Sequence, residues 1–415
     1  MALPNPLPLH TIHTHTHTHT LNCIDMHTTG QPTRIIHSGF PALQGATLLD
    51  KRDDAAAHHD TLRRRLMLEP RGHAEMYGAI LVHETERVAA GEADIGVLFV
   101  HAGGFSTMCG HATLALGRVC VDLGLGFSIP EMQVGRAKQQ EGEPEEREVR
   151  IHAPCGVVRL LRVRSDPARA VSFLSTPGYV AGLGIEVEIP EDVQWAELGG
   201  RRKVTVDISY GGAFYAMVDV RELGFAFERG LSMDHMAGDG AFSVEMKAMA
   251  AAARRLKRYL SSHPAVVAAM RNRAEDERLA FLYGVMVVDS RSEGGYRPEG
   301  VEGAETGVCF FGESDQVDRS PTGSCVTARV ALAYAKGSRE VGQRWAYNSL
   351  VSRHFRTGAF VGSIVETGVP VRGYLGESWP GVIVRVEGNA YYTGTSTFIH
   401  EEGDITSDGG FRLDL

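Results

Sequence analysis

Two glycine turns in this chain carry side chains that are able to do chemistry. Cys109 stands directly before Gly110 in the first turn. Thr322 stands directly before Gly323 in the second. Apolar residues at helical spacing follow each glycine, so each turn is predicted to begin a helix. Because the two segments align residue for residue, we predict the same strand–turn–helix unit in each half of the chain. A thiol in one copy and a hydroxyl in the other make this duplicated scaffold chemically asymmetric.

A helix start is a good place for such groups. Its free backbone N–H groups and partial positive charge bind carboxylates. The same field lowers the pKa of a thiol, and the thiolate is the reactive form, so we expect a lowered pKa for Cys109. Two facing helix starts would clamp one carboxylate between a cysteine and a threonine, which suits removal of the Cα proton of a small amino or imino acid. The alternative is an ordinary buried thiol, and the second matching turn argues against it.

Five motifs follow one another along the chain between about Ile24 and Phe398. They are Asp25–Pro32 (DMHTTGQP), Glu69–His73 (EPRGH), Met108–His111 (MCGH), Tyr210–Tyr215 (YGGAFY) and Asp318–Gly323 (DRSPTG). With these motifs the chain resembles the proline racemase superfamily, and within it the trans-3-hydroxy-L-proline dehydratases. Racemases and epimerases of this superfamily carry cysteine at both catalytic positions, whereas Thr322 occupies the second one here, as in the dehydratases. Cys325 departs from the pattern, since a small glycine is expected there.

The resemblance implies an α+β fold like that of diaminopimelate epimerase. This fold has two pseudo-symmetric halves, each a curved and mostly antiparallel sheet around a central helix, with the active site in the cleft between them. We place the halves at residues 21–200 and 201–384 and expect the strands at about 385–400 to return to the first half. Residues 1–20 are expected to be a disordered tail rich in His and Thr.

Local patterns place strands and helices along the chain. Short β-branched runs predict strands at Gly96–Val100, Val157–Leu161, Val204–Ile208, Val285–Asp289 and Val382–Val386. Helical spacing or composition predicts helices over 111–123, over 325–335 and within 236–276. The charged segment 133–148 is predicted to be a surface loop or hairpin insertion.

The resemblance also implies roles for the site residues. Cys109 in the first half would take the Cα proton, and Asp318 in the second would pair with the ring ammonium, a strong charge-assisted contact. Asp318 could instead only cap a turn, and His111 could simply pack in the first turn of its helix. The groups expected to offer backbone N–H donors to the substrate carboxylate are Gly110, His111, Gly323 and Ser324.

Thr322, the second expected catalytic residue, decides the reaction. A threonine hydroxyl is too weak an acid and base to serve the second face of Cα unaided. In trans-3-hydroxy-L-proline, however, the Cα hydrogen and the C3 hydroxyl lie on one ring face. Cys109 could therefore take the proton and return it to the departing hydroxyl. The expected activity is a cofactor-independent hydro-lyase reaction that ends, after tautomerisation, at Δ1-pyrroline-2-carboxylate.

Three other interpretations remain open. A proline or hydroxyproline racemase or epimerase would pair Cys109 with a second acid, for which Cys325 is the candidate. Cys325 lies one helical turn beyond Thr322, about 5 Å along the axis, whereas proton transfer requires hydrogen-bond reach. The chain could also be a catalytically inactive amino-acid-binding protein, or a metal-binding protein acting through the alternating His and Thr residues of 13–20.

The composition of the chain limits the classes of partner and cofactor that we expect it to bind. The 415 residues carry a net charge of −9, which argues against nucleic acid or an anionic membrane as a partner. Six cysteines without a C-x-x-C pair predict reduced thiols in the cytoplasm, and no signal peptide or long apolar span is recognised. We expect no metal and no cofactor, since zinc spacing, a phosphate-binding loop and a dinucleotide fingerprint are missing. The expected partner is a small imino-acid substrate, and a homodimer is usual among the proteins that the chain resembles.

Overall fold

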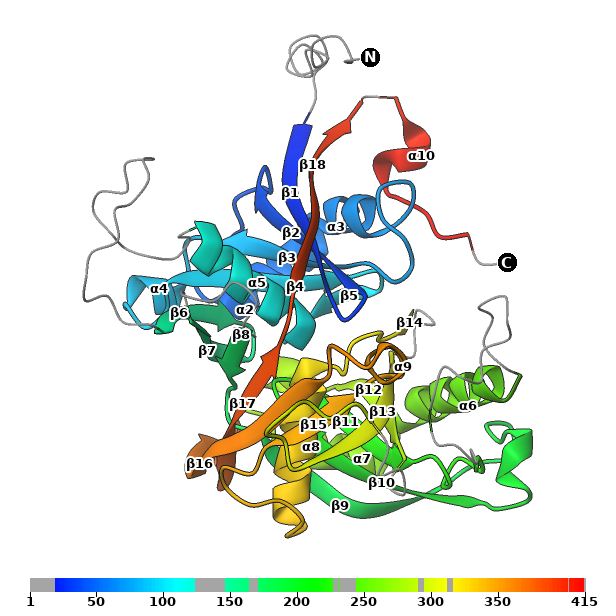
Figure 1. Ribbon diagram of the computed structural model, residues 1–415. Helices are drawn as coiled ribbons and strands as arrows, with labels where there is room; N and C mark the ends of the chain where they lie inside the picture. The colour runs from blue at the N-terminus through cyan, green and yellow to red at the C-terminus, as the bar shows by residue number, and fades with distance from the viewer. Residues whose placement is uncertain are drawn as a thin grey trace, which may run out of the picture.

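The computed structural model describes most of the chain (Figure 1). The described residues are 19–123, 146–163, 171–226, 231, 244–289, 295–311, 316–401 and 403–413. The predicted tail therefore lies outside them except for its last two residues, which begin the first strand. The predicted loop 133–148 also lies outside them up to residue 145, and its last three residues begin β6.

Each short β-branched run forms the strand that the sequence predicts. Those five strands are β4 (Ile95–His101), β7 (Gly156–Val163), β10 (Lys203–Tyr210), β12 (Leu282–Val288) and β17 (Ser378–Gly388). The other strands of the first part of the chain are β1 (His19–Thr28), β2 (Gln31–Ser38), β3 (Tyr77–Val82), β5 (Gly104–Ser106), β6 (Glu146–Ala153) and β8 (Val171–Leu174). The remaining strands are β9 (Tyr179–Glu188), β11 (Phe214–Asp219), β13 (Gly303–Phe311), β14 (Gln316–Val317), β15 (Trp345–Asn348), β16 (Phe360–Arg372) and β18 (Tyr391–His400).

The strand pairings follow the same pattern twice. In one set the order is β18-β1-β2-β3-β4-β6-β7-β8, with β5 added to β4. In the other it is β9-β10-β11-β12-β13-β15-β16-β17, with β14 added to β13. Each set contains two parallel pairs at corresponding places, β2/β3 and β4/β6 in one, β11/β12 and β13/β15 in the other. We call the first set with its helices the first half and the second set with its helices the second half.

The two halves exchange one strand each. β9 follows β8 in sequence but pairs with β10, and β18 follows β17 but pairs with β1. Hydrogen bonds between β8 and β17 join the two sets into one mixed sheet. β9 lies before the expected boundary at residue 200, so strand pairing favours a boundary near residue 175. The exact division into domains stays a prediction.

One helix runs through the middle of each half. α5 (Gly110–Leu123) packs against β1, β2, β7 and β8, and α8 (Gly323–Ala335) packs against β9, β10, β16 and β17. Both are buried on nearly every face of their first ten residues, as expected for central helices with apolar residues all round. The two helices begin at the predicted glycines and touch each other at the interface between the halves.

The remaining helices include one that is longer than either central helix. The predicted helical stretch within 236–276 is confirmed by α6 (Val244–Leu260) and α7 (Pro264–Arg271). α6 packs its apolar stripe on β12 and β13. The others are α2 (Leu48–His58), α3 (Asp60–Met67), α4 (Glu86–Ala89), α9 (Leu350–Phe355), α10 (Ile405–Asp408) and the 3₁₀ helices η2 (Ala196–Leu198) and η4 (Glu277–Leu279).

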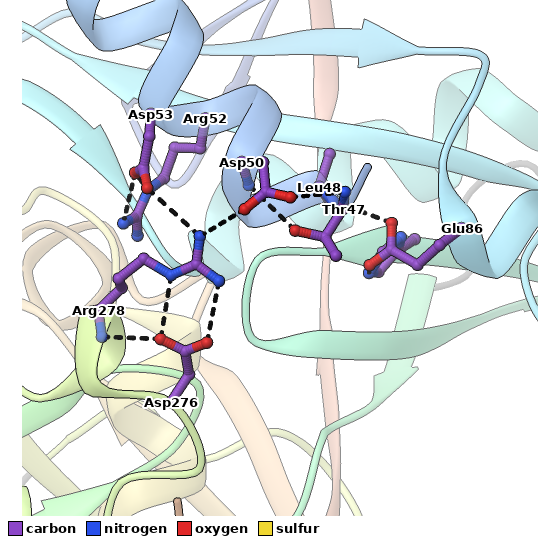
Figure 2. A network of polar contacts seen from close by, with 9 residues as sticks. Thr47, Leu48, Asp50, Arg52, Asp53, Glu86, Asp276 and Arg278 are labelled. Atoms are coloured by element: carbon purple, nitrogen blue, oxygen red, sulfur yellow. Dashed lines mark hydrogen bonds and ion pairs between the residues drawn. The ribbon is translucent and has the colours of Figure 1, made fainter. Parts of the chain in front are cut away.

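An ion network joins the halves away from the central helices (Figure 2). Arg278 in η4 reaches the carboxylates of Asp50 at 2.9 Å and Asp53 at 3.3 Å, both on α2 of the first half. Asp276 orients the guanidinium from within the second half at 3.0 Å. Asp50 also accepts the backbone N–H of Thr47 in the capping box of α2. The network therefore joins the N-terminus of α2 in the first half to the 3₁₀ helix η4 in the second half.

Candidate active site

The two glycine turns meet at the interface between the halves. A Cβ atom built on Gly110 would lie 2.4 Å from the Cα atom of Gly323 and 2.5 Å from the amide nitrogen of Ser324. Only glycine allows such an approach of two backbones. Two helix N-termini that face each other place like partial charges close together, so the arrangement favours an anion between them.

Cys109 stands directly before α5 and is 4% exposed. Its Sγ atom lies 3.5 Å from Nδ1 of His111, and its carbonyl accepts the N–H of Thr113 at 2.9 Å as the helix begins. Burial raises the pKa of the Cys109 thiol, although the backbone N–H of Ala112 acts in the opposite direction. The expected lowering of the thiol pKa is therefore wrong for this closed arrangement, because loss of solvent outweighs the field of one helix start.

His111 is held as a neutral ring. Burial lowers its pKa to about 3, and the ring of Tyr77 packs on it edge to face at a centroid distance of 4.8 Å. Thr28 donates a hydrogen bond to the carbonyl oxygen of His111 at 3.1 Å. The first strand of the chain thus fixes the backbone of the first turn of α5.

The second turn combines a carboxylate with a hydroxyl. Thr322 Oγ1 donates to Asp318 Oδ2 at 2.8 Å, and the N–H of Ser320 donates to Asp318 Oδ1 at 2.8 Å. Burial raises the pKa of Asp318 to about 6, while the hydrogen bonds from Ser320 and Thr322 lower it. The threonine hydroxyl is therefore engaged with a neighbouring acid.

Thr322 adopts a backbone conformation that β-branched residues rarely take. Its φ angle is 62° and its ψ angle is 79°, in the left-handed region. Ser320 accepts the N–H of Thr322 at 3.1 Å, and the N–H of Val326 donates to the Thr322 carbonyl at 2.8 Å. Such strained positions persist only where the surroundings determine them, and they cluster at functional sites.

Ser324 packs against the YGGAFY motif. Its hydroxyl is 2.7 Å from the hydroxyl of Tyr215. A Cβ atom on Gly211 would lie 2.2 Å from the carbonyl oxygen of Ser324, so this glycine lets β10 and its turn approach the first turn of α8. The motif at 210–215 therefore packs directly against Ser324 in the first turn of α8.

Cys325 is fully buried, and its Sγ atom lies 3.9 Å from Sδ of Met217 in β11. Burial raises the pKa of its thiol. Its sulfur packs as an apolar group of the core, in contact with a thioether.

Aromatic residues that sequence reasoning did not select surround the first turn. Tyr77 is 2% exposed, and its hydroxyl has no hydrogen-bond partner in the described part of the chain. Burial and the nearby Tyr283, Asp318 and Cys109 raise its pKa well above the usual value. Phe311 packs on both tyrosine rings. Tyr77 lies four residues after the end of the EPRGH motif. This proximity is the one feature of the sequence that could have marked it as a site residue.

Three other motif residues make hydrogen bonds with the backbone outside the two glycine turns. His27 Nδ1 is 3.2 Å from the N–H of Gly30 in the first hairpin, His73 Nδ1 is 3.2 Å from the N–H of Glu75, and Arg71 donates to the carbonyl of Ile399 at 2.8 Å. Over the described residues, His, Cys and carboxylate side chains form no cluster of three suited to a metal ion. Within the same ranges, none of the helices has the length and apolarity needed to cross a bilayer.

The mixed sheet, the duplicated strand order and the paired glycine turns define an α+β fold in which the candidate site lies where the two glycine turns meet. The sequence model of the proline racemase family matches residues 23–411. The chain therefore belongs to the proline racemase family.

Relatives of known name cover almost the whole chain. Trans-L-3-hydroxyproline dehydratase of Mus musculus is 40% identical over 392 residues, which are 94% of this chain and 94% of the relative. Trans-3-hydroxy-L-proline dehydratase of Homo sapiens is 39% identical over the same length and shares.

Solved structures agree on the fold. A probable proline racemase from Agrobacterium radiobacter K84 has a TM-score of 0.71 at 20% identity, covering 95% of this chain and 96% of its own. A hydroxyproline epimerase from Agrobacterium vitis has a TM-score of 0.68 at 20% identity, covering 96% and 97%. The predicted fold class is thereby confirmed.

Proposed function

We propose that this protein is a hydro-lyase that converts trans-3-hydroxy-L-proline to Δ1-pyrroline-2-carboxylate. The identity to the mouse and human dehydratases over nearly the whole chain supports this substrate. One observation of the site carries the choice of elimination over inversion. Racemases of the family carry a second cysteine at the position of Thr322. Here the side chain at that position is a hydroxyl, and it donates a hydrogen bond to Asp318.

In the proposed reaction, Cys109 removes the Cα proton. The backbone N–H groups at the starts of α5 and α8 hold the substrate carboxylate, and Asp318 pairs with the ring ammonium. Burial raises the pKa of the thiol, and in the proposed reaction the ammonium of the bound substrate supplies the positive charge that favours the thiolate. In this proposal, binding of the substrate zwitterion also converts the Cys109 thiol to the thiolate that acts as the base.

The elimination balances without a further reactant. The Cα–H bond breaks as Cys109 takes the proton, and the C3–O bond breaks as the same proton returns to the leaving hydroxyl. One water molecule leaves, and the enamine tautomerises to the pyrroline. Thr322 acts here by orienting Asp318. We also propose that the reaction needs no cofactor, that the enzyme is a homodimer, and that it works in the cytoplasm, where its six unpaired thiols would stay reduced.

The rival activity is racemisation or epimerisation with Cys325 as the second acid. The position of its sulfur beside Met217, on the β11 side of α8, argues against that assignment.

The test follows L-proline, trans-4-hydroxy-L-proline and trans-3-hydroxy-L-proline separately by NMR in D₂O with purified enzyme. We expect Δ1-pyrroline-2-carboxylate from the 3-hydroxy substrate alone. Rapid formation of D-proline from L-proline would refute the dehydratase assignment in favour of the racemase.

A further inference from the structure

A second set of contacts between the halves lies beside the candidate active site. It joins the segment after the EPRGH motif to the strand that leads into the second glycine turn. We call these residues the cross-half clamp: Gln31, Ala74 and Glu75 from the first half, and Gln316, Val317 and Arg319 from the second.

Glu75 makes the charged contact of the clamp. Its Oε2 atom lies 2.5 Å from Nη1 of Arg319 and accepts the backbone N–H of Val317 at 3.3 Å. The same guanidinium donates to the carbonyl of Val317 at 2.8 Å. The side chains of Glu75 and Arg319 are 22% and 38% exposed, so the contact lies near the surface but is not fully solvated.

Gln31 bridges the same two segments from inside the protein. It is fully buried. Its Nε2 donates to the carbonyl of Glu75 at 3.0 Å, and its Oε1 accepts the backbone N–H of Arg319 at 2.8 Å. Gln316 adds a third contact by donating to the carbonyl of Ala74 at 2.6 Å. A buried amide with both ends satisfied fixes the register of the segments that it joins.

Asp318 lies between the two backbone positions that the clamp holds. Val317 on one side and Arg319 on the other are tied to the first half, whereas the carboxylate and the N–H of Asp318 make their hydrogen bonds with Ser320, Thr322 and Cys309 of the second half. The first half therefore reaches the carboxylate through the main chain on either side of it.

The candidate site is closed to solvent. Cys109, Asp318 and Thr322 are each 4% exposed, so a substrate reaches them only after the surrounding residues move, and these residues come from both halves. A movement that parted the halves would break the contacts of Glu75 with Val317 and Arg319, and closure would form them again.

We propose that Glu75 is a positioning residue for Asp318. When the halves close on the substrate, its contacts with Val317 and Arg319 set the main chain around Asp318 and so align the carboxylate with the substrate ammonium. This inference rests on the proposed function for its kinetic test and adds to it a residue that couples closure to assembly of the site.

The test compares three variants with the parent enzyme. Glu75→Ala removes the charge and the acceptor, and we expect kcat/KM to fall about 10- to 100-fold, the scale of a misplacement of roughly 1 Å. Glu75→Gln keeps an acceptor for the N–H of Val317 and should recover part of the loss. The matched control is Glu148→Gln, which breaks the ion pair with Arg159 between β6 and β7 within one half. It should behave as the parent.

Two further measurements separate positioning from general stability. In an Asp318→Asn background, Glu75→Ala should add little, because residues that act through one another are not additive. The rate of alkylation of Cys109 by iodoacetamide, followed by mass spectrometry of its peptide, should rise in Glu75→Ala and Glu75→Gln and stay unchanged in Glu148→Gln.

The outcomes are distinct. An inactive parent enzyme would contradict the proposed function, while the alkylation rates would still test the clamp. An active parent with a Glu75 effect no larger than that of Glu148→Gln would overturn the inference. So would a Glu75→Ala loss that keeps its full size in Asp318→Asn. If Glu75→Ala does not fold, Glu75→Gln carries the same comparisons, with unchanged kcat/KM and unchanged alkylation as the contrary result.

Discussion

The hydroxyl of Thr322 is expected to set the pH at which the enzyme loses activity on the acid side. It donates to Asp318 at 2.8 Å, and burial raises the pKa of that carboxyl to about 6 against the hydrogen bonds that lower it. In the proposed reaction, the ionised carboxylate is the form that pairs with the substrate ammonium. As the pH falls through about 6, Asp318 is protonated and log kcat/KM should fall more steeply, by one additional unit per pH unit.

Thr322→Val tests this assignment with little change in shape. Valine is β-branched like threonine, so it meets the same left-handed backbone strain at φ 62°. It lacks the donor, however, and a hydrogen bond to a charged group is worth about 1.5–3 kcal/mol. At about 1.4 kcal/mol per pH unit, its loss raises the pKa of Asp318 by about one to two units. The break in the profile should then move up to roughly pH 7–8.

The assay is kcat/KM for trans-3-hydroxy-L-proline across the pH range, with thermal unfolding of each variant as the control for folding. Thr322→Ser keeps the donor, so its break should stay with that of the parent. If Thr322→Val shows its break at the parental pH, the hydroxyl does not control the ionisation of Asp318. If the two variants shift equally, the backbone rather than the donor is responsible.

Four other variants probe the rest of the site and the interface. Cys109→Ser should lower turnover by about 10²–10⁴, because an alcohol cannot replace the thiolate as base, and isothermal titration should still show substrate binding through the backbone. Thr322→Cys should gain slow Cα inversion, seen by NMR in D₂O as D-proline formed from L-proline. Cys325→Ala should leave dehydration essentially intact. If Thr322→Cys shows no inversion and Cys325→Ala abolishes turnover, Cys325 is the second acid. Arg278→Ala should lower the Tm at low ionic strength and by less in concentrated salt, because its partly exposed ion pairs are screened, and an equal loss at both salt concentrations would point to packing instead.

Local signals explain why the central elements could be predicted. Each predicted strand is a short β-branched run, and the two central helices begin at the glycine that breaks the preceding pattern, at Gly110 and Gly323. Turn chemistry and apolar spacing are properties of neighbouring residues, so the sequence alone displays them. The family and the fold class, which were predicted from the motifs, are confirmed by the match over residues 23–411 and by the solved structures.

Other properties depend on segments that are far apart in the sequence. The pKa of Cys109 follows from burial that both halves produce together, so the expected lowering was wrong although the helix start was predicted correctly. The pairing of β9 with β10 depends on an exchange of strands that no local pattern marks. The hydrogen bond between Thr322 and Asp318 joins residues four apart, yet only the left-handed turn at Thr322 brings the two side chains together.

The two turns of the duplicated scaffold differ in the residue that precedes them as well as in the residue before the glycine. Four residues before Cys109 the chain has Phe105, and four residues before Thr322 it has Asp318. A thiolate and a carboxylate at one turn would repel each other, since each like charge raises the pKa of the other. Threonine accepts the neighbouring carboxylate because its hydroxyl donates to it. In the proposed mechanism, the thiol that takes the proton lies in one half and the carboxylate that binds the ammonium lies in the other. A substrate that carries both an acidic Cα proton and an ammonium engages the two groups together only when the halves are closed.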